Sequence, residues 1–158
     1  MAQEIERKFL VRDESWKADA TSSTRFGQGY LSSGSKATVR VRTKDDRRAV
    51  ITIKGASNGM SRAEYEYDIP IEDGRELLDL AGNEVVLKTR HIVPFGGLTW
   101  EVDVFEGKLE GLVMAEVELE SEDQHVALPP WAGREVTADD RYYNSSLARA
   151  AGPPATEG

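Results

Sequence analysis

The chain has 158 residues, of which 39% are hydrophobic and 30% are charged, as expected for one globular domain. It contains no cysteine, which excludes disulfides, thiolate metal ligands and a thiol nucleophile. A net charge of −8 argues against binding to nucleic acid or to an anionic membrane, and no apolar run is long enough to span one. We therefore expect a cytoplasmic protein, monomeric or homodimeric, without nucleic-acid or membrane partners.

Alternating apolar and polar residues predict eight strands, each bounded by turn-forming residues. The expected ranges are 3–11, 25–31, 36–43, 48–54, 62–71, 84–93, 98–106 and 112–120. Loops are expected at 32–35, 55–59 and 121–134, and Pro94 with Gly96 and Gly97 is expected to form a turn. Helical turns at 13–20 should pack Trp16 inward, a helix is expected at 72–80, and a short helix at 144–151 should have Asn144 as its N-cap.

The succession of short strands with tight connections is typical of a meandering antiparallel sheet. Closing such a sheet into a barrel removes its exposed edges. No repeat or linker divides the chain. The predicted fold class is therefore mainly β (α+β), with a single eight-stranded barrel domain over residues 1–151, a few flanking helices, and a disordered tail at 152–158.

Charged residues recur at a spacing of two on most of these strands. Because side chains alternate faces along a strand, Glu4, Glu6 and Lys8 point the same way. The same face of later strands carries Arg40 and Arg42, Lys54, Glu64 and Glu66, Lys88 and Arg90, Glu101 and Asp103, and Glu116 and Glu118. For any single strand, a solvent-exposed face is the better explanation. Taken together, the faces are nearly all charged and their signs segregate by strand, which favours a charged barrel interior facing a charged ligand.

The residue types indicate which ligand such an interior suits. Arginine makes planar, bidentate contacts with phosphate, and lysine acts as a point charge. Carboxylates supply the oxygen ligands that hard divalent cations such as Mg²⁺ and Mn²⁺ prefer. No glycine-rich phosphate loop of the G-x-x-x-x-G-K-[ST] kind is present, which argues against a P-loop enzyme.

The order of these motifs resembles the CYTH family of triphosphate tunnel metalloenzymes, and most closely its bacterial inorganic triphosphatases. The opening Glu4-Ile5-Glu6-Arg7-Lys8 matches the family signature E-x-E-x-K. The resemblance continues, in the expected order, through segments 28–31, 39–42, 52–55, 62–66, 88–90, 100–105, 115–119, 135–137 and 142–144. It covers about residues 2–150, and the ordered set is far more specific than the opening pentapeptide alone.

The resemblance implies a role for each charged face. Triphosphate oxygens would be bound by Lys8, Arg40, Arg42, Lys54, Lys88 and Arg90. Metal would be held by Glu4, Glu6, Glu116 and Glu118, assisted by Asp103, Glu64 and Glu66. Lys8 and Tyr30 resemble a catalytic Lys–Tyr pair of the tripolyphosphatase branch, in which the lysine acts as a base. An ordinary strand aromatic explains Tyr30 equally well.

We predict hydrolysis of a terminal phosphoanhydride, with one divalent ion bridging the phosphates and a second activating water. Inorganic tripolyphosphate is the first choice of substrate. Thiamine triphosphate, nucleoside triphosphates and adenylate cyclase chemistry remain alternatives on the same fold. An organic substrate would need an aromatic platform, but Trp16, Trp100 and Trp131 are expected in the core. A non-catalytic polyphosphate- or nucleotide-binding module would use the same charges, whereas a lipocalin-like carrier would need an apolar interior.

Overall fold

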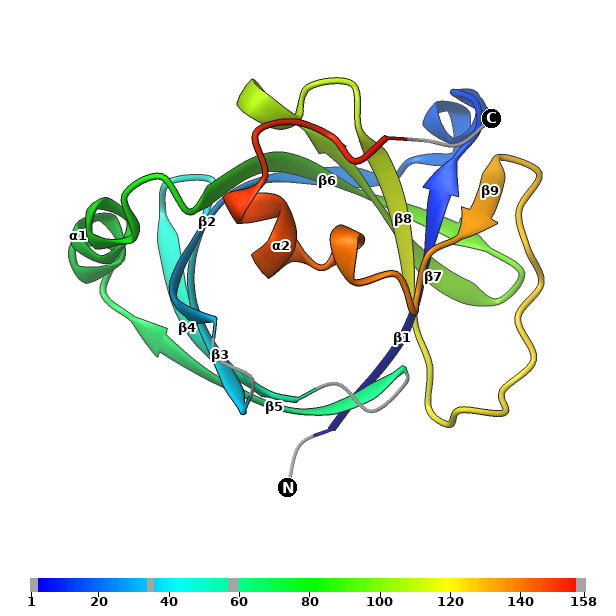
Figure 1. The fold of residues 1–158 in the computed structure, drawn as a ribbon. Coiled ribbons are helices and arrows are strands. Elements are labelled where there is room, and N and C mark those ends of the chain that lie inside the picture. Colours follow the sequence, from blue (N-terminus) through cyan, green and yellow to red (C-terminus); the bar gives the residue numbers. More distant parts are fainter. Residues whose placement is uncertain (1–2, 34–35, 57–59, 156–158) are drawn as a thin grey trace.

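The wall of the molecule is one antiparallel sheet that closes on itself. The computed structural model describes residues 3–33, 36–56 and 60–155. Its strands are β1 (Gln3–Val11), β2 (Ser22–Ser33), β3 (Ala37–Lys44), β4 (Arg48–Gly55), β5 (Ser61–Ile69), β6 (Val85–Phe95), β7 (Leu98–Phe105), β8 (Val113–Glu118) and β9 (Ala132–Glu135). The first eight follow the order β5-β4-β3-β2-β6-β7-β8-β1, and β1 pairs with β5 to close the ring (Figure 1). The predicted eight-stranded barrel is confirmed.

Strand β1 closes the barrel by dividing its edge between two partners. Its first residues pair with β5 from Gln3 opposite Ala63, and β9 pairs with the other end from Phe9 opposite Glu135. The opposite edge of β1 pairs along β8. The prediction of a loop throughout 121–134 was therefore wrong at β9. This strand has only four residues and no alternating pattern, and its pairing with β1 defines it.

Two further local predictions need correction or restriction. Pro94 lies inside β6, opposite Thr99, and the turn to β7 consists of Gly96 and Gly97 alone. Both glycines have positive φ, 60° and 78°, which suits a two-residue hairpin turn and disfavours larger residues. The predicted features at 34–35, at 57–59 and at 156–158 lie outside the described residues, and 152–155 form no helix or strand.

The outer face of β1, β7 and β8 carries the main apolar cluster. Trp100 is fully buried there, with its ring centroid 5.5 Å from that of Phe9 and 5.6 Å from that of Trp131. The 3₁₀ turn Ser15–Asp19 adds Trp16 to the same cluster. All three tryptophans are thus buried, as predicted, and they lie on the side of the wall opposite to the charged faces.

Helix α1 (Ile71–Ala81) covers the outside of β2, β3 and β4 (Figure 1). Gly74 permits the close approach, because a Cβ at this position would collide with the Cβ of Ala49 on β4. No helix of the described residues is both long and apolar enough to cross a membrane.

The C-terminal segment lies across one end of the barrel. Figure 1 shows helix α2 (Asn144–Arg149) inside the ring of strands. Two 3₁₀ turns, Gly107–Leu109 and Asp140–Tyr142, precede this helix in the chain. Leu147 and Tyr142 are fully buried in a second apolar cluster with Tyr30, Phe105 and Met114 of the wall. This end of the barrel interior is therefore filled by apolar packing.

The prediction that Asn144 caps α2 was wrong. The N-cap residue is Tyr143, and no side-chain cap is formed. The Asn144 Oδ1 atom instead accepts a hydrogen bond of 3.2 Å from Lys88 Nζ on β6. The contact ties the start of α2 to the charged interior of the barrel.

Candidate active site

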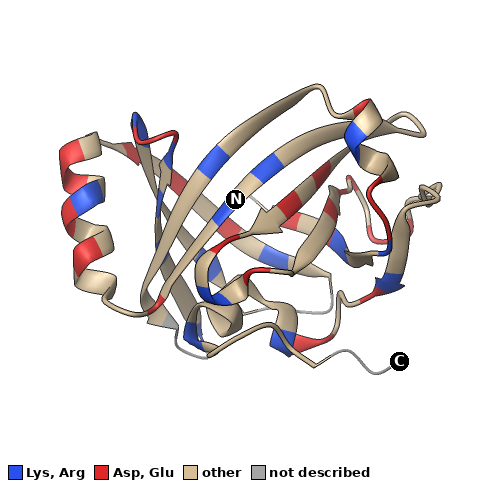
Figure 2. Cartoon of the chain, turned by 90° about the horizontal axis from the view of Figure 1, so that it is seen from above, with Lys and Arg blue, Asp and Glu red and all other residues tan. Residues whose placement is uncertain are grey.

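The barrel interior, called the lumen below, contains a cavity of about 140 Å³. Its lining consists of Glu4, Glu6, Arg40, Arg42, Lys54, Glu64, Glu66, Arg90, Glu101, Glu116, Glu118 and Asn144. Among the described residues, every lining side chain is charged except Asn144, and none is apolar or aromatic. Figure 2 shows basic positions (blue) and acidic positions (red) as bands on the strands of the barrel wall.

Exposure changes along the lumen. On β8, Met114 is 2% exposed, Glu116 is 6% exposed, and Glu118 is exposed to solvent. Met114 belongs to the apolar cluster around α2, so the lumen opens in the direction away from that helix. The six bases predicted to bind triphosphate, Lys8, Arg40, Arg42, Lys54, Lys88 and Arg90, are all buried. Burial of so many cations is costly unless an anion compensates them.

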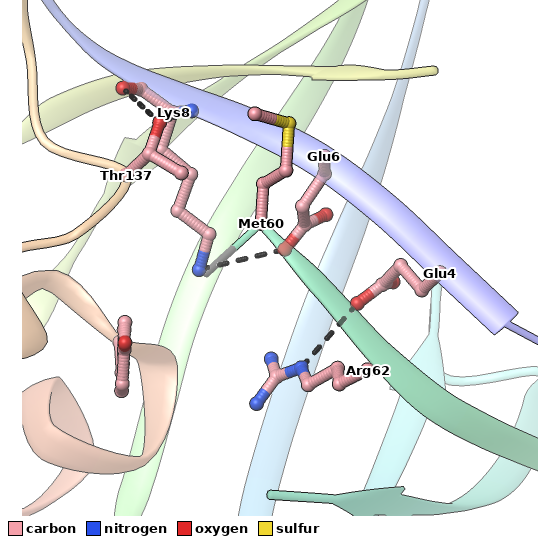
Figure 3. Close-up of a pocket in the computed structure, with 7 residues that line it drawn as sticks. Glu4, Glu6, Lys8, Met60, Arg62 and Thr137 are labelled. Atoms are coloured by element: carbon pink, nitrogen blue, oxygen red, sulfur yellow. Dashed lines mark hydrogen bonds and ion pairs between the residues drawn. The ribbon is translucent and has the colours of Figure 1, made fainter. Parts of the chain in front are cut away.

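The first strand contributes acids and a base to one patch of the lumen (Figure 3). Lys8 Nζ lies 3.6 Å from a carboxylate oxygen of Glu6, and Arg62 Nε lies 3.6 Å from Glu4. Glu4 also binds Lys54 Nζ at 2.9 Å. The alternation of β1 places these groups on one face, as predicted, and the pairing of β1 with β5 brings Arg62 beside them.

The carboxylates of this patch have opposing pKa shifts. Burial and the nearby Glu116 raise the pKa of Glu6 to about 7. Burial and the adjacent Glu4 likewise raise the pKa of Glu64 to about 7. Burial also acts to raise the pKa of Glu4, but Lys54 and the hydrogen bond with Glu64 outweigh it, and the pKa falls to about 2. The lumen therefore holds more carboxylates here than its own cations neutralise.

Strands β6 and β7 hold a dense ion-pair cluster. Asp103 binds Lys88 Nζ at 2.6 Å, and its two oxygens accept from Arg90 at 2.7 and 2.8 Å. Arg90 also lies 3.3 Å from Glu101 and 3.5 Å from Glu116. Burial lowers the pKa of Lys88 to about 7 despite Asp103. The pKa of Arg90 rises because Asp103 and the other carboxylates outweigh its burial.

Strand β3 holds its two arginines differently. Arg42 Nε donates to Gln28 Oε1 at 2.6 Å, and its guanidinium lies over the Phe26 ring at 4.3 Å. Arg40 donates to Thr52 Oγ1 at 3.3 Å. Both partners are uncharged, whereas the bases of β6 are paired with carboxylates.

Tyr30 and Lys8 both lie near the α2 end of the lumen. Tyr30 is 5% exposed and lines a hollow of about 10 Å³ with Arg40, Asn144 and other residues. Burial lowers the pKa of Lys8, but Glu6 and Glu116 outweigh it, so the pKa of the ammonium rises above its ordinary value. The Nζ atom also lies 5.6 Å from the centre of the Tyr143 ring.

The lumen has the donor chemistry for a hard divalent cation but no preformed cage. Within the described ranges, no three acidic or histidine side chains converge on one point. Mg²⁺ does not require such a cage, because it keeps several waters and commonly binds one or two carboxylates plus substrate phosphates. The carboxylates of the cavity wall, with the raised pKa of Glu6 and Glu64, fit this mode of binding.

Sequence reasoning missed three polar residues of this site and placed Glu101 on the charged face without giving it a role. Arg62 has the same parity as Glu64, so spacing alone could have assigned it to the lumen. Gln28 and Asn144 carry no charge, and only their contacts with Arg42 and Lys88 reveal them. Asp103 and Lys88 do not line the cavity, since both are fully buried and paired with each other.

The chain forms a closed barrel whose lumen carries buried bases beside carboxylates, and comparison with known proteins places this barrel in a family. The CYTH domain matches residues 2–150. The chain belongs to this family, as the sequence motifs predicted.

Individual relatives agree with this placement. The inorganic triphosphatase of Acetivibrio thermocellus is 45% identical over 150 residues, covering 94% of this chain and 95% of that protein. The inorganic triphosphatase of Nitrosomonas europaea is 37% identical over 149 residues, covering 92% and 96%. A crystal structure of an inorganic triphosphatase superposes with a TM-score of 0.69 at 36% identity, covering 95% of this chain and 97% of that one.

Proposed function

We propose that this protein hydrolyses the terminal phosphoanhydride of inorganic tripolyphosphate in a reaction that depends on a divalent metal ion. The observation that carries the proposal is the lining of the 140 Å³ cavity, in which every described residue is charged or polar and none is aromatic. Phosphate oxygens suit such a wall, whereas a thiazole, pyrimidine or purine ring would find no stacking surface. Both relatives named above are inorganic triphosphatases.

The buried bases bind and orient the phosphate chain. Arg40 and Arg42 face the cavity and have no carboxylate partner in the part of the chain that the structure describes, and we propose that they take phosphate oxygens first. Lys54 and Arg90 also face the cavity, where exchange of their carboxylate partners for phosphate would follow binding. Fixed cations in a water-poor site stabilise the negative charge that develops on the leaving oxygens.

The carboxylates face the same cavity. We propose that Glu4, Glu6, Glu116 and Glu118 hold two Mg²⁺ or Mn²⁺ ions, with Glu64 and Glu66 assisting. A bound ion of this kind neutralises phosphate charge and lowers the pKa of coordinated water. Because the pKa values of Glu6 and Glu64 are raised to about 7, binding of a cation by these carboxylates would be coupled to loss of their protons.

Lys8 and Asp103 acquire more specific roles under this proposal. The raised pKa of Lys8 keeps its side chain as an ammonium, which favours phosphate binding over the base role predicted for the Lys8–Tyr30 pair. Asp103 is buried between Lys88 and Arg90 and outside the cavity lining, so we propose that it positions these bases.

Phosphate release with tripolyphosphate, ATP and thiamine triphosphate, each with Mg²⁺, with Mn²⁺ or with EDTA, tests the proposal. We expect release from tripolyphosphate with either metal ion, much less from the two organic triphosphates, and none in EDTA. Preferred turnover of ATP or thiamine triphosphate would contradict the substrate. Formation of cyclic AMP would indicate a cyclase, and tight binding without release would indicate a binding module.

A further inference from the structure

The bases of the lumen differ in the charge of their partners. Carboxylate oxygens lie within 3.6 Å of the side-chain nitrogens of Lys8, Lys54, Arg62, Lys88 and Arg90. Over the described parts of the chain, Arg40 and Arg42 have no carboxylate at ion-pair distance. Their hydrogen-bond acceptors are the hydroxyl of Thr52 and the amide of Gln28. The two β3 arginines are thus positioned by neutral hydrogen-bond acceptors, which do not neutralise their positive charge.

The Gln28 amide has only one orientation that fits its surroundings. A guanidinium only donates, so the Gln28 oxygen must face Arg42 Nε, at 2.6 Å, and the Gln28 nitrogen must point elsewhere. This nitrogen is buried and has no hydrogen-bond partner among the described residues, and the same is true of Arg40 Nε. Buried donors without acceptors are costly in a folded protein and indicate a ligand or water that completes them.

A carboxylate at position 28 would bind Arg42 more tightly than the amide does. Glutamate and glutamine have nearly the same size and reach, and hydrogen bonds between ions are about twice as strong as neutral ones. Burial, together with Arg40 and Arg90, already lowers the pKa of Arg42 to about 9, so the site is short of negative charge. Glutamine at this position therefore leaves the folded chain less stable than glutamate would, while it leaves the charge of Arg42 available.

We propose that Gln28 is a positioning residue that fixes the Arg42 guanidinium while leaving its charge uncompensated, so that Arg40 and Arg42 form the primary docking point for a highly charged phosphate chain. The inference rests on the proposed function of the lumen as a tripolyphosphate site. Under this inference, the negative charge that compensates the β3 arginines comes from the bound substrate and not from a side chain of the protein.

The test compares Gln28→Glu with Gln28→Met, measuring both tripolyphosphate affinity by calorimetry in EDTA and the thermal midpoint without ligand. Gln28→Glu should weaken tripolyphosphate binding about tenfold to hundredfold, because the charge of Arg42 is already neutralised. The same variant should raise the thermal midpoint by about 2–4 °C. Gln28→Met keeps the site neutral but loses the acceptor, so it should weaken binding less and should not raise the midpoint.

Two controls separate the charge from general effects of the substitution. Gln124 accepts a backbone hydrogen bond of 2.7 Å from Glu120 in an outer loop, so Gln124→Glu makes the same chemical change away from the lumen. It should alter neither affinity nor midpoint. In an Arg42→Met background, Gln28→Glu should no longer raise the midpoint, because a true pair interaction disappears when either partner is removed.

Equal losses of affinity in Gln28→Glu and Gln28→Met, without a gain in midpoint for the glutamate, would show a merely structural role and overturn the inference. Unchanged affinity in Gln28→Glu would overturn it as well. The stability comparison needs no turnover, so it decides the role of Gln28 even if the wild-type protein releases no phosphate. A wild-type protein that binds tripolyphosphate but does not hydrolyse it would contradict the proposed function alone, whereas a wild-type protein that does not bind it would contradict both.

Discussion

The two faces of the barrel wall have opposite compositions. Outside β1, β7 and β8, three tryptophans and their neighbours form a close-packed apolar cluster. Inside the same strands, carboxylates and bases line a cavity whose described lining residues include no apolar side chain. The alternation of each strand supplies both faces at once, so Glu116 points into the lumen and Val117 points to the cluster.

The outer face of the wall contributes mainly to stability, and the inner face carries the residues of the proposed site. Apolar burial and aromatic packing stabilise the fold on the outer face and around α2. The charges of the lumen destabilise the fold as well as stabilise it, because burial and neighbouring carboxylates raise the pKa of Glu6 and of Glu64. Substitutions on the two faces should therefore differ in which property they change.

The largest effect is expected outside the lumen. Trp100→Ala removes a side chain that is 0% exposed and contacts Phe9 and Trp131, so the free energy of unfolding should fall by about 3–5 kcal/mol. Urea denaturation measures this loss, and activity per folded molecule should change little. Tyr67→Ala, at an outward position that is 57% exposed, serves as control and should change stability by less than about 0.5 kcal/mol. If Trp100→Ala lost no more stability than Tyr67→Ala, the assignment of Trp100 to the core would be wrong.

Inside the lumen, Glu6→Gln should lower the rate of phosphate release by about 100-fold or more while the barrel stays folded. It removes a carboxylate from the wall that we propose for the metal ions. Glu135→Gln is the matched control, since Glu135 lies on β9 and pairs with Arg7 away from the cavity. Full phosphate release by Glu6→Gln in excess Mg²⁺ would contradict the metal role.

The wild type and Glu6→Gln should also differ in how their stability depends on pH. The pKa of Glu6 is about 7 in the folded chain, above the ordinary 4.5. The contribution of Glu6 to the free energy of unfolding is therefore fully present below pH 4.5 and is lost as the pH rises through 7. In EDTA, Glu6→Gln should equal the wild type near pH 4.5 and exceed it by about 1–3 kcal/mol at pH 7.5. Thermal midpoints across this range measure the difference, and added Mg²⁺ should reduce it by stabilising the wild type. A difference that does not grow with pH would contradict the burial of this carboxyl among like charges.

The smallest effect is expected where the two regions meet. Asn144→Ala removes one acceptor of the buried Lys88 ammonium but leaves Asp103 in place, so stability should fall by about 1 kcal/mol. Ser146→Ala, in the same first turn of α2, is the control. A change no larger in Asn144→Ala than in Ser146→Ala, by chemical denaturation, would mean that Lys88 does not hold the helix.

The sequence predicted the wall of the barrel better than its contents. Strict alternation identified β1 and its lumen face, and the three tryptophans were expected in the core. Strand β9 has too few residues to show a period, and its pairing with β1 forms only in the closed sheet. Gln28 and Asn144 were missed as site residues because their roles depend on Arg42 and Lys88, which approach them only across strands or elements.

The C-terminal helix also has a kinetic consequence. Among the described residues, the hollows next to Tyr143 and Ser145, on the side of the lumen that this segment fills, have volumes of about 10 and 20 Å³, which hold a water molecule or two but no phosphate chain. Under the proposed function, substrate and products must then use the same mouth, at the Glu118 side. Released phosphate and pyrophosphate would leave against the incoming substrate, which makes competitive product inhibition and an inability to thread long polymers properties of the barrel's shape.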